Sequence, residues 1–355
     1  MRAVYFILSM YFCLMAVAQQ TPPTLTIEQH LEDYDFAVKY IEDNYAGFSY
    51  WVVDSTRADY EATKASLRSE VERGERPSWD AIAAYTGWFS DFHMALSVFY
   101  PTTYPFTHFK RQFRSYEGLD PVPVACKVTD KTFLIRFPSC QGDPDMKWVK
   151  NSIKLFKKSR CENLILDIRF NDGGNDHMYE PYLKLLYDHE ALTPKPEYRN
   201  TPQNLAYLKK VGWHPIVHKL AAENPDAGFL SLGSELIKYK KVDKAVRKAA
   251  LIIDNAGSSG ESMVLEIKAC SYRTTTYGRD NTTGCLDFAN LSHVFLPNSG
   301  LNLSVPMTRR TGLPESSVDK NGISPDVRIN LPLPSKLTDN IDEWVIWVAE
   351  QLEKD

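Results

Sequence analysis

Residues 163–170, NLILDIRF, contain consecutive apolar residues from Leu164 to Leu166 and end at the polar, glycine-containing segment NDGGND (171–176). Such an unbroken run is typical of a strand buried on both faces of a sheet, because a half-exposed strand would alternate apolar and polar residues. A helical pattern restarts at about Glu180. The order strand, glycine turn, helix indicates the start of a βα unit and therefore predicts an α/β fold.

The same order of elements recurs further along the chain. The apolar run AALIID (249–254) is followed by the small-residue turn NAGSSG (255–260) and by the helical segment ESMVLEIKA (261–269). Other runs predict strands and amphipathic helices, at residues 121–128, 131–139, 273–278 and 301–310 for the strands and at 145–159 and 342–353 for the helices. Together these segments form the predicted α/β core.

The first part of the chain has a helical pattern. Thr26 and Gln29 have the spacing of a capping box, and apolar residues follow at helical intervals. Further helices are predicted over 58–71 and from about Ser78. Residues 19–98 are therefore expected to form a helical N-terminal subdomain.

Size and charge limit the kinds of protein that this chain can be. Its 355 residues, 43% of them apolar, suit one large or two modest globular domains. The net charge of −4 and the lack of a basic block argue against a nucleic-acid partner. Residues 99–355 are expected to form the α/β core. Within it, residues 193–247 are charged, contain proline and favour helix, so we expect a helical insertion or lid.

Residues 1–18 have the pattern of a secretory signal peptide. Arg2 supplies the positive start, an apolar run follows, and Ala16-Val17-Ala18 is a small-x-small cleavage pattern. A membrane anchor is the alternative, but the run is short and lacks charged residues on its far side. We expect cleavage after Ala18, a secreted or periplasmic protein, and no membrane span in the remainder.

Five cysteines remain after the signal peptide, and an oxidising compartment would permit disulfide bonds. Cys126 and Cys140 end two predicted hairpin strands and are the favoured pair, and Cys270 with Cys285 is the second candidate pair. Because five is odd, at least one thiol is unpaired or pairs elsewhere. None of these cysteines has metal-ligand spacing, so we expect no metal site and no catalytic cysteine.

Two serines lie between the second buried strand and its helix. Free N–H groups and the positive dipole end of the helix would lie beside a hydroxyl in this loop. An oxyanion that develops next to Ser258 or Ser259 would find donors there. The alternative role is a helix cap, the most common role of serine at a helix start. The turn lacks the Gly-x-Ser-x-Gly pattern of the α/β-hydrolases, because Gly257 and Gly260 are too close together.

Three further elements can contribute to chemistry. Gly173 and Gly174 either offer N–H groups to an oxyanion or carboxylate or form a plain βα turn. Asp319 or Asp326 could orient a histidine, although Asp326 is better interpreted as a turn residue that caps local N–H groups. A histidine base would activate a serine, but spacing alone does not select among His30, His93, His108, His177, His189, His214, His218 and His293.

In this order, the elements resemble the tail-specific, or C-terminal-processing, serine peptidase family, and in particular its tricorn-core-like branch. DIRFNDGG (167–174) is similar to the family's Asp-x-Arg-x-Asn-x-Gly-Gly, and IIDNAGSSGE (252–261) to its strand, turn and Ser-x-x-Glu. YGRDNTTG (277–284) is close to its Tyr/Ile-Gly-x-x-Thr-x-Gly segment, and GISPDV (322–327) matches its last motif. The resemblance covers roughly residues 88–330.

The resemblance implies roles for the residues of the two turns. The family's nucleophile stands three residues before a glutamate, which selects Ser258 because Glu261 follows at that spacing. The implied oxyanion donors are the backbone N–H of Ser259 and that of either Gly173 or Gly174.

The resemblance also implies a general base and its partner. One branch of the family uses a lysine about 25 residues after the serine, but this chain has Thr283 there and no lysine nearby. The other branch uses the histidine of an Asp-x-His segment, and DFH (91–93) selects His93. Asp319 stands where that branch has a glutamate, so it is the implied third member of a triad. The sequence shows no PDZ module, which many relatives carry.

For the whole protein, the resemblance implies a crotonase-like ββα core and a secreted serine peptidase. Its substrate would be a peptide or protein, cleaved through an acyl-enzyme without metal or cofactor. The substitutions at Thr283 and Asp319 leave open a catalytically silent peptide-binding relative. An esterase or other acyl hydrolase with the same triad is a third reading.

Overall fold

The computed structural model describes residues 23–97, 121–141, 146–337 and 340–354, and within these ranges the chain forms two compact units. The first unit contains the described residues of Met1–Phe109 together with Arg199–Gly228 and Asn290–Thr308. The second contains those of Lys110–Tyr198, Phe229–Ala289 and Arg309–Asp355. The predicted signal peptide lies outside the described residues.

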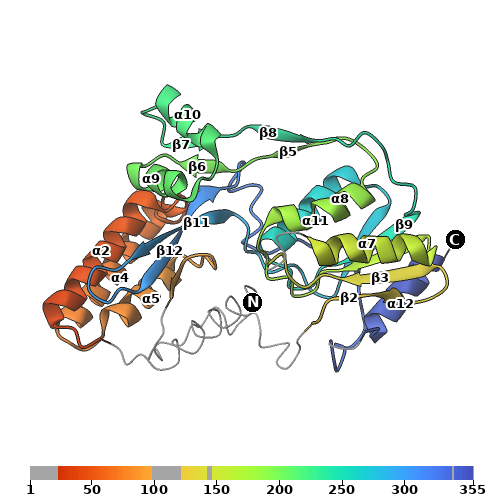
Figure 1. Cartoon of the computed structure of the whole chain (residues 1–355). Coiled ribbons are helices and arrows are strands. Elements are labelled where there is room, and N and C mark those ends of the chain that lie inside the picture. The colour runs from red at the N-terminus through yellow and green to blue at the C-terminus, as the bar shows by residue number, and fades with distance from the viewer. Residues whose placement is uncertain (1–22, 98–120, 142–145, 338–339, 355) are drawn as a thin grey trace, which may run out of the picture. The chain divides into compact units, whose positions relative to one another are not determined.

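The second unit is built on a six-stranded sheet that contains both buried runs of the sequence (Figure 1). The strand order is β13-β10-β9-β4-β3-β2, and all neighbours are parallel except β2 and β3. β4 and β9 are neighbours, with Leu166 beside Leu251, so the turns after both strands lie at the same edge of the sheet. The strands are β2 Val124–Lys127, β3 Thr132–Arg136, β4 Asn163–Asp167, β9 Lys248–Ile252, β10 Thr274–Gly278 and β13 Val327–Arg328.

Helices cover both faces of this sheet. Leu164 and Leu166 of β4 join a core cluster with α7, α8 and α11, while Ile165 joins a cluster with α12 on the other face. Successive strand residues point to opposite faces, so burial on both sides explains why this strand lacks polar alternation. The predicted mixed α/β class is confirmed. The helices are α7 Lys147–Ser159, α8 Glu180–Leu186, α11 Ser259–Cys270 and α12 Glu343–Glu353, and a short 3-10 helix, η1, spans Asp176–Met178.

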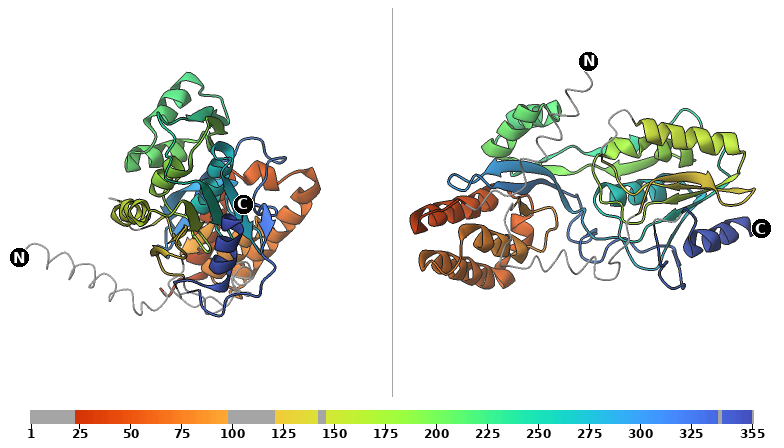
Figure 2. Two further views of the ribbon diagram at one scale, coloured as in Figure 1. Left: turned by 90° about the vertical axis from the view of Figure 1, so that its right-hand side faces the viewer. Right: turned by 60° about the horizontal axis from the view of Figure 1, so that its bottom comes forward.

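The first unit begins with helices, as predicted. α2, α4 and α5 pack side by side (Figure 2, right) around buried tyrosines that include Tyr60 and Tyr85. The capping box of α2 is present, because the Gln29 N–H donates to the Thr26 hydroxyl and the Thr26 N–H donates to the Gln29 side chain. The helices are α2 Ile27–Asn44, α3 Phe48–Trp51, α4 Asp54–Glu72 and α5 Ser78–Trp88.

Paired strands follow these helices. β1 (Ala95–Ser97) pairs with β12 (Asn302–Arg309), and β11 (Phe288–Phe295) also pairs with β12. β11 was not predicted. Its burial does not alternate along the strand, so the sequence has no clear period of two.

The region from 193 to 247 contains more than the predicted helices. α9 (Pro202–Val211) and α10 (Pro215–Glu223) occupy its middle. Short strands surround them, and β8 pairs antiparallel with β5. Strands of three or four residues are too short to give a recognisable periodicity. They are β5 Ala191–Pro194, β6 Glu197–Arg199, β7 Phe229–Ser231 and β8 Ser234–Ile237.

All five described cysteines are free thiols, so neither expected disulfide is formed. Cys126 packs with the cluster around α12, whereas Cys140 belongs to the cluster on the opposite face of the sheet. Cys270 ends α11, whereas Cys285 donates its N–H to Glu261 near the start of that helix. Nine residues of helix span about 14 Å, which exceeds the reach of a disulfide.

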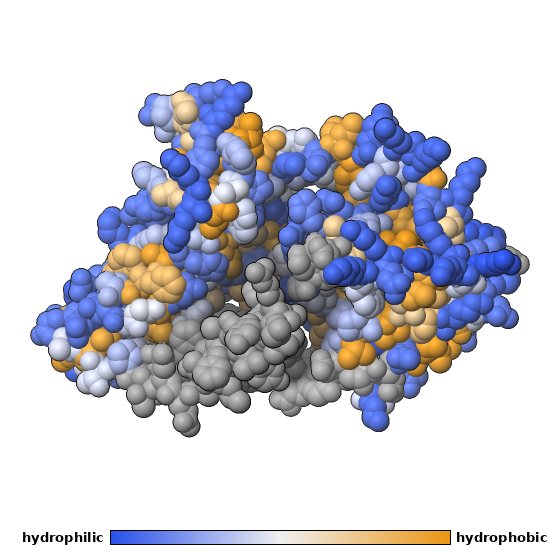
Figure 3. Space-filling model, in the orientation of Figure 1, coloured by the Kyte–Doolittle hydropathy of each residue, from blue (hydrophilic) through white to orange (hydrophobic). Residues whose placement is uncertain are grey.

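Within the described ranges, no helix has both the length and the apolar character needed to cross a bilayer. Figure 3 shows polar side chains over much of the visible face, with apolar residues in separate patches. Leu192, Tyr272 and Phe295 are the most exposed large apolar residues among those described. Single exposed apolar residues are common on protein surfaces.

Candidate active site

Ser258 lies in a strained turn between β9 and α11. Its backbone has φ 52° and ψ −120°, a conformation that non-glycine residues rarely adopt. Ser258 is half-buried, whereas Gly257 and Ser259 on either side are buried. Strain of this kind persists only where the surrounding structure enforces it, and it is concentrated at functional sites. Ser258 is also the N-cap residue of α11 and forms a capping box with Glu261, so the predicted cap is present together with the strained backbone.

The carboxylate of Glu261 holds this turn in place. One oxygen, Oε2, accepts the backbone N–H of Ser258 at 3.2 Å and that of Cys285 at 2.8 Å. The other, Oε1, accepts the Thr282 hydroxyl at 2.6 Å and the Gly284 N–H at 2.8 Å. Glu261 is fully buried, and burial raises its pKa, although these four hydrogen bonds act in the opposite direction. One side chain thus fixes both the serine turn and the 282–285 segment.

Gly173 lies directly against Ser258. A Cβ at this glycine would be 2.6 Å from the Ser258 Cβ, and φ at Gly173 is +81°. Only glycine fits such a close approach in this conformation. The Gly173 N–H donates to the side-chain oxygen of Asn171 at 3.0 Å, and the Ser259 hydroxyl donates to the carbonyl of Gly174 at 3.0 Å. The structure therefore brings the two predicted turns together.

The backbone N–H groups of Ser259 and Gly174 have no hydrogen-bond acceptor among the described residues. Ser259 is the first residue of α11, where an N–H has no partner within the helix. Gly174 is exposed and follows the glycine that contacts Ser258. The Gly173 N–H is already used by Asn171. The site therefore offers Ser259 and Gly174 as donors to a ligand.

Thr283 also lies beside the serine turn. Its N–H donates to the Ala256 carbonyl at 2.8 Å, and its side chain is 3.5 Å from where a Cβ of Gly257 would stand. The position predicted to carry a lysine in one branch thus carries a hydroxyl at the site.

Asp319 is bonded to the segment that follows Cys285. Its Oδ1 accepts the N–H of Leu286 at 2.5 Å and that of Asp287 at 2.8 Å. The carboxylate of Asp287 in turn accepts the Asp319 N–H at 3.1 Å. Cys285 accepts the Ser258 N–H through its carbonyl, at 3.0 Å. Asp319 therefore supports the wall of the serine turn.

Asp326 lies elsewhere, directly before β13 and beside the strand β10. It accepts the backbone N–H and the hydroxyl of Thr276 at 2.9 and 2.8 Å, and it forms an ion pair with Lys268. Asp326 therefore accepts an N–H, but from a residue 50 positions away on a neighbouring strand and not from its own turn.

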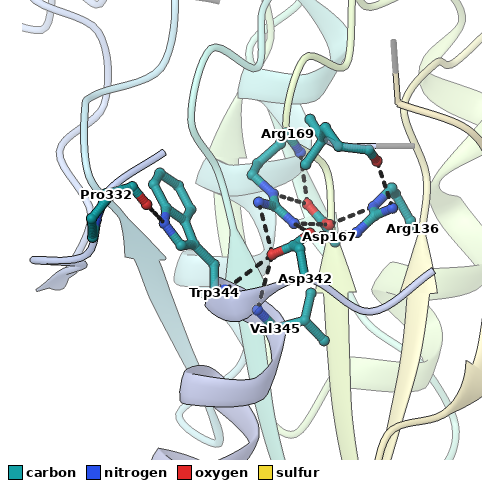
Figure 4. A network of polar contacts seen from close by, with 8 residues as sticks. Arg136, Asp167, Arg169, Pro332, Asp342, Trp344 and Val345 are labelled. Carbon is teal, nitrogen blue, oxygen red and sulfur yellow. Dashed lines mark hydrogen bonds and ion pairs between the residues drawn. The ribbon is translucent and has the colours of Figure 1, made fainter. Parts of the chain in front are cut away.

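The Asp-x-Arg part of DIRFNDGG forms a buried ion network (Figure 4). Asp167 pairs with Arg136 at 2.7 Å and with Arg169 at 2.6 Å, and both arginines contact Asp342 at 2.8 Å. Burial alone would raise the pKa of Asp167, but Arg169 and Arg136 lower it to about 2. Asp342 also caps α12, so the network fixes the end of β4 just before the glycine turn. Sequence reasoning missed Arg136 and Asp342, because neither lies in a motif.

His93 belongs to the first unit, in a turn between α5 and β1. It is half-buried, and its backbone N–H donates to Oδ1 of Asp91 at 2.9 Å. The other predicted site residues all belong to the second unit. Among the described residues, no group of three or more His, Cys, Asp or Glu side chains is arranged to hold a metal ion.

Comparisons with known proteins place this site in a family context. The model of a family described as Peptidase family S41 matches residues 131–329, more than half of the chain. This range includes both turns and Asp319 and leaves out His93. A search of curated proteins finds no match to the chain.

Solved structures resemble the chain along most of its length. Mature CPAF has a TM-score of 0.64 at 13% identity, covering 93% of this chain and 97% of its own. Mature CPAF complexed with lactacystin gives 0.63 at 14%, covering 93% and 98%. A protein of Parabacteroides merdae described as a candidate peptidase gives 0.56 at 14%, covering 86% and 90%. At these identities the likeness shows a shared fold.

Proposed function

This chain belongs to peptidase family S41, and from that premise we propose that it is a serine peptidase that cleaves peptide or protein substrates through an acyl-enzyme. We assign the nucleophile to Ser258 and the general base to His93. A cleaved signal peptide would deliver the enzyme to the periplasm or the outside of the cell. The finer description of the second unit as a crotonase-like ββα core is part of the same proposal.

In the proposed reaction, the Ser258 hydroxyl attacks the scissile carbonyl while the imidazole of His93 takes its proton. The tetrahedral intermediate then collapses, and the imidazolium returns that proton to the leaving amine. Water, deprotonated by the same imidazole, attacks the acyl-enzyme and releases the new carboxyl group. Asp319 would orient the imidazole. The chemistry needs no metal or cofactor.

The oxyanion of this intermediate would accept hydrogen bonds from the N–H groups of Ser259 and Gly174. The choice of Gly174 over Gly173 is supported by the bond that already occupies the Gly173 N–H, at 3.0 Å from Asn171. Donors that are held in place before reaction act strongly, because they need no reorganisation as charge develops.

One observation carries the proposal: a strained, half-exposed serine whose side chain lies against a glycine at the start of a helix. A fluorophosphonate probe tests it, because such probes phosphonylate serines that a base has activated. We expect covalent labelling of the full-length protein and its loss in Ser258→Ala. Ser262→Ala, one turn further along the same helix, is the matched control and should label like the wild type.

Absence of labelling in the wild type, with a peptide still bound, would favour the silent peptide-binding relative. Labelling together with turnover of simple esters but not of a peptide panel would favour an esterase. Labelling that persists in Ser258→Ala would remove Ser258 from the role of nucleophile.

A further inference from the structure

A buried carboxylate holds the turn that carries His93. Asp91 is 6% exposed, and its Oδ1 accepts the backbone N–H of His93 at 2.9 Å. Its second oxygen, Oδ2, accepts the hydroxyl of Tyr45 at 2.6 Å. Tyr45 follows α2, so this bond joins two parts of the chain 46 residues apart. The turn is therefore fixed to the helical core rather than by local bonds alone.

The direction of the Tyr45 hydroxyl is also set. The indole N–H of Trp51 donates to the Tyr45 oxygen at 3.0 Å, and an indole nitrogen can only donate. The single hydroxyl proton of Tyr45 is thus left for Asp91. Bonds to an ionised acceptor are shorter and stronger than neutral ones, in agreement with the 2.6 Å separation.

The ring of Tyr45 is confined on several sides. It is fully buried and meets Phe89 edge to face, with ring centroids 5.4 Å apart. A Cβ at Gly47 would lie 2.3 Å from the Tyr45 hydroxyl oxygen, so the chain has glycine where any side chain would displace the ring. The glycine at position 47 thus leaves room for the hydroxyl end of the Tyr45 ring, which is the end that contacts Asp91.

Backbone hydrogen bonds to β12 also hold this part of the chain. Directly after His93, the strand β1 pairs with β12, with Ala95 opposite Ser304. The N–H of Ala46, next to Tyr45, donates to the carbonyl of Pro306 in the same strand at 3.0 Å. The segment that carries Tyr45 and the strand that follows His93 are therefore both bonded to β12.

We propose that Tyr45 and Asp91 are positioning residues that fix the His93 turn for proton transfer, with Trp51 directing the Tyr45 hydroxyl. This inference rests on the proposed function, because it assumes that His93 is the general base. A general base must be held within a fraction of an ångström of the position from which it takes the proton. If the turn that carries it becomes mobile, the reaction rate falls although the residues of the site are still present.

The test compares two buried tyrosines of the same helical core. Tyr45→Phe keeps the ring but removes the donor to Asp91. Tyr60→Phe is the matched control, because the Tyr60 hydroxyl also donates to a carboxylate, Glu42, at 2.6 Å, and Tyr60 is equally buried. We measure the maximal rate and the half-saturating concentration for fluorophosphonate labelling of Ser258. Tyr45→Phe should lower the maximal rate about tenfold with unchanged half-saturation, whereas Tyr60→Phe should alter neither.

Asp91→Asn tests the same turn with a side chain of nearly the same size, so it leaves no cavity. Its amide oxygen can still accept the His93 N–H, so its rate should lie between those of the wild type and Asp91→Ala. NMR of ¹⁵N-labelled histidine gives a readout that does not depend on activity. The His93 ring signals should broaden or split in Tyr45→Phe and stay single in Tyr60→Phe.

The outcomes separate the two proposals. If His93→Ala abolishes labelling but Tyr45→Phe behaves like Tyr60→Phe, the positioning role is wrong and the proposed function stands. If His93→Ala labels at the wild-type rate, the proposed function fails and the positioning role fails with it.

Discussion

The serine turn of the second unit and the histidine turn of the first use the same device. In each, a buried carboxylate accepts the backbone N–H of the residue proposed for chemistry: Glu261 for Ser258 and Asp91 for His93. The two differ in how the rest of the carboxylate is used. Glu261 accepts three further bonds from the 282–285 segment, whereas Asp91 accepts the hydroxyl of a tyrosine that a tryptophan orients.

The two turns also differ in backbone conformation. Ser258 has a positive φ and lies against Gly173, so its conformation costs free energy that neighbouring contacts must offset. His93 itself is not among the residues with positive φ, although Ser90 at the start of its turn has φ 52°. We infer that the serine turn depends on several strong constraints at once, and that the bonds of Tyr45 and Trp51 contribute to holding the histidine turn.

The largest expected effect follows from Glu261→Gln. An amide nitrogen would face donors in place of one carboxylate oxygen, and at least one buried N–H would lose its acceptor. Fluorophosphonate labelling should fall more than ~100-fold, and the free energy of unfolding should fall by about 2–4 kcal/mol. Labelling kinetics and urea unfolding measure the two effects. Glu350→Gln, an exposed glutamate of α12, is the control, and equal behaviour of the two variants would refute the role of Glu261.

Gly173→Ala is expected to have the next largest effect. Its Cβ would lie 2.6 Å from that of Ser258, so the serine or the glycine loop must move. Labelling should fall about 100-fold, because small displacements at a reacting centre cost rate steeply. Gly212→Ala is the matched control, since Gly212 also has a positive φ, of +71°, but has no atom within 4 Å of its Cβ position. A Gly173→Ala variant that labels as well as Gly212→Ala would contradict the close packing at Ser258.

Acid should weaken the buried ion network of Asp167 at the end of β4. The pKa of Asp167 is about 2 in the folded chain and 3.8 in its ordinary state, so the folded form holds its proton less tightly. The stabilisation is therefore complete above about pH 4 and is lost as the pH falls through about 2. It amounts to about 2 kcal/mol, and chemical unfolding at pH 6, 4, 3 and 2 measures it. Arg136→Met should reduce this acid dependence, and an unchanged slope would contradict the pairing.

Trp51→Phe should have the smallest effect. It removes the donor to the Tyr45 oxygen and leaves the bond from Tyr45 to Asp91. The labelling rate should fall two- to threefold, by about the value of one neutral hydrogen bond at the edge of the chain of contacts. A loss as large as that of Tyr45→Phe would mean that Trp51 acts through packing instead.

Much of the second unit could be predicted because its strands are buried on both faces. The run NLILDIRF and the run AALIID became the adjacent strands β4 and β9, and their turns met as the motifs implied. The parts that failed depend on contacts distant in sequence. Spacing could not show that Cys126 and Cys140 lie on opposite faces, or that β11 pairs with β12.

The candidate site was predicted in part for the same reason. Ser258 followed from a local motif, but the choice between Gly173 and Gly174 needed the bond from Gly173 to Asn171. Asp91 was visible in DFH only as a neighbour of His93. Its partner Tyr45 is 46 residues away and belongs to no motif, so only the folded chain could reveal it.

The most direct measurement is a crystal structure of the full-length protein after reaction with a fluorophosphonate. The account predicts a covalent bond from phosphorus to the Ser258 oxygen, with the phosphoryl oxygen bonded to the N–H groups of Ser259 and Gly174. It also predicts a ring nitrogen of His93 about 3 Å from the Ser258 oxygen. An adduct on Ser258 with His93 distant and directed to another surface would contradict the central claim.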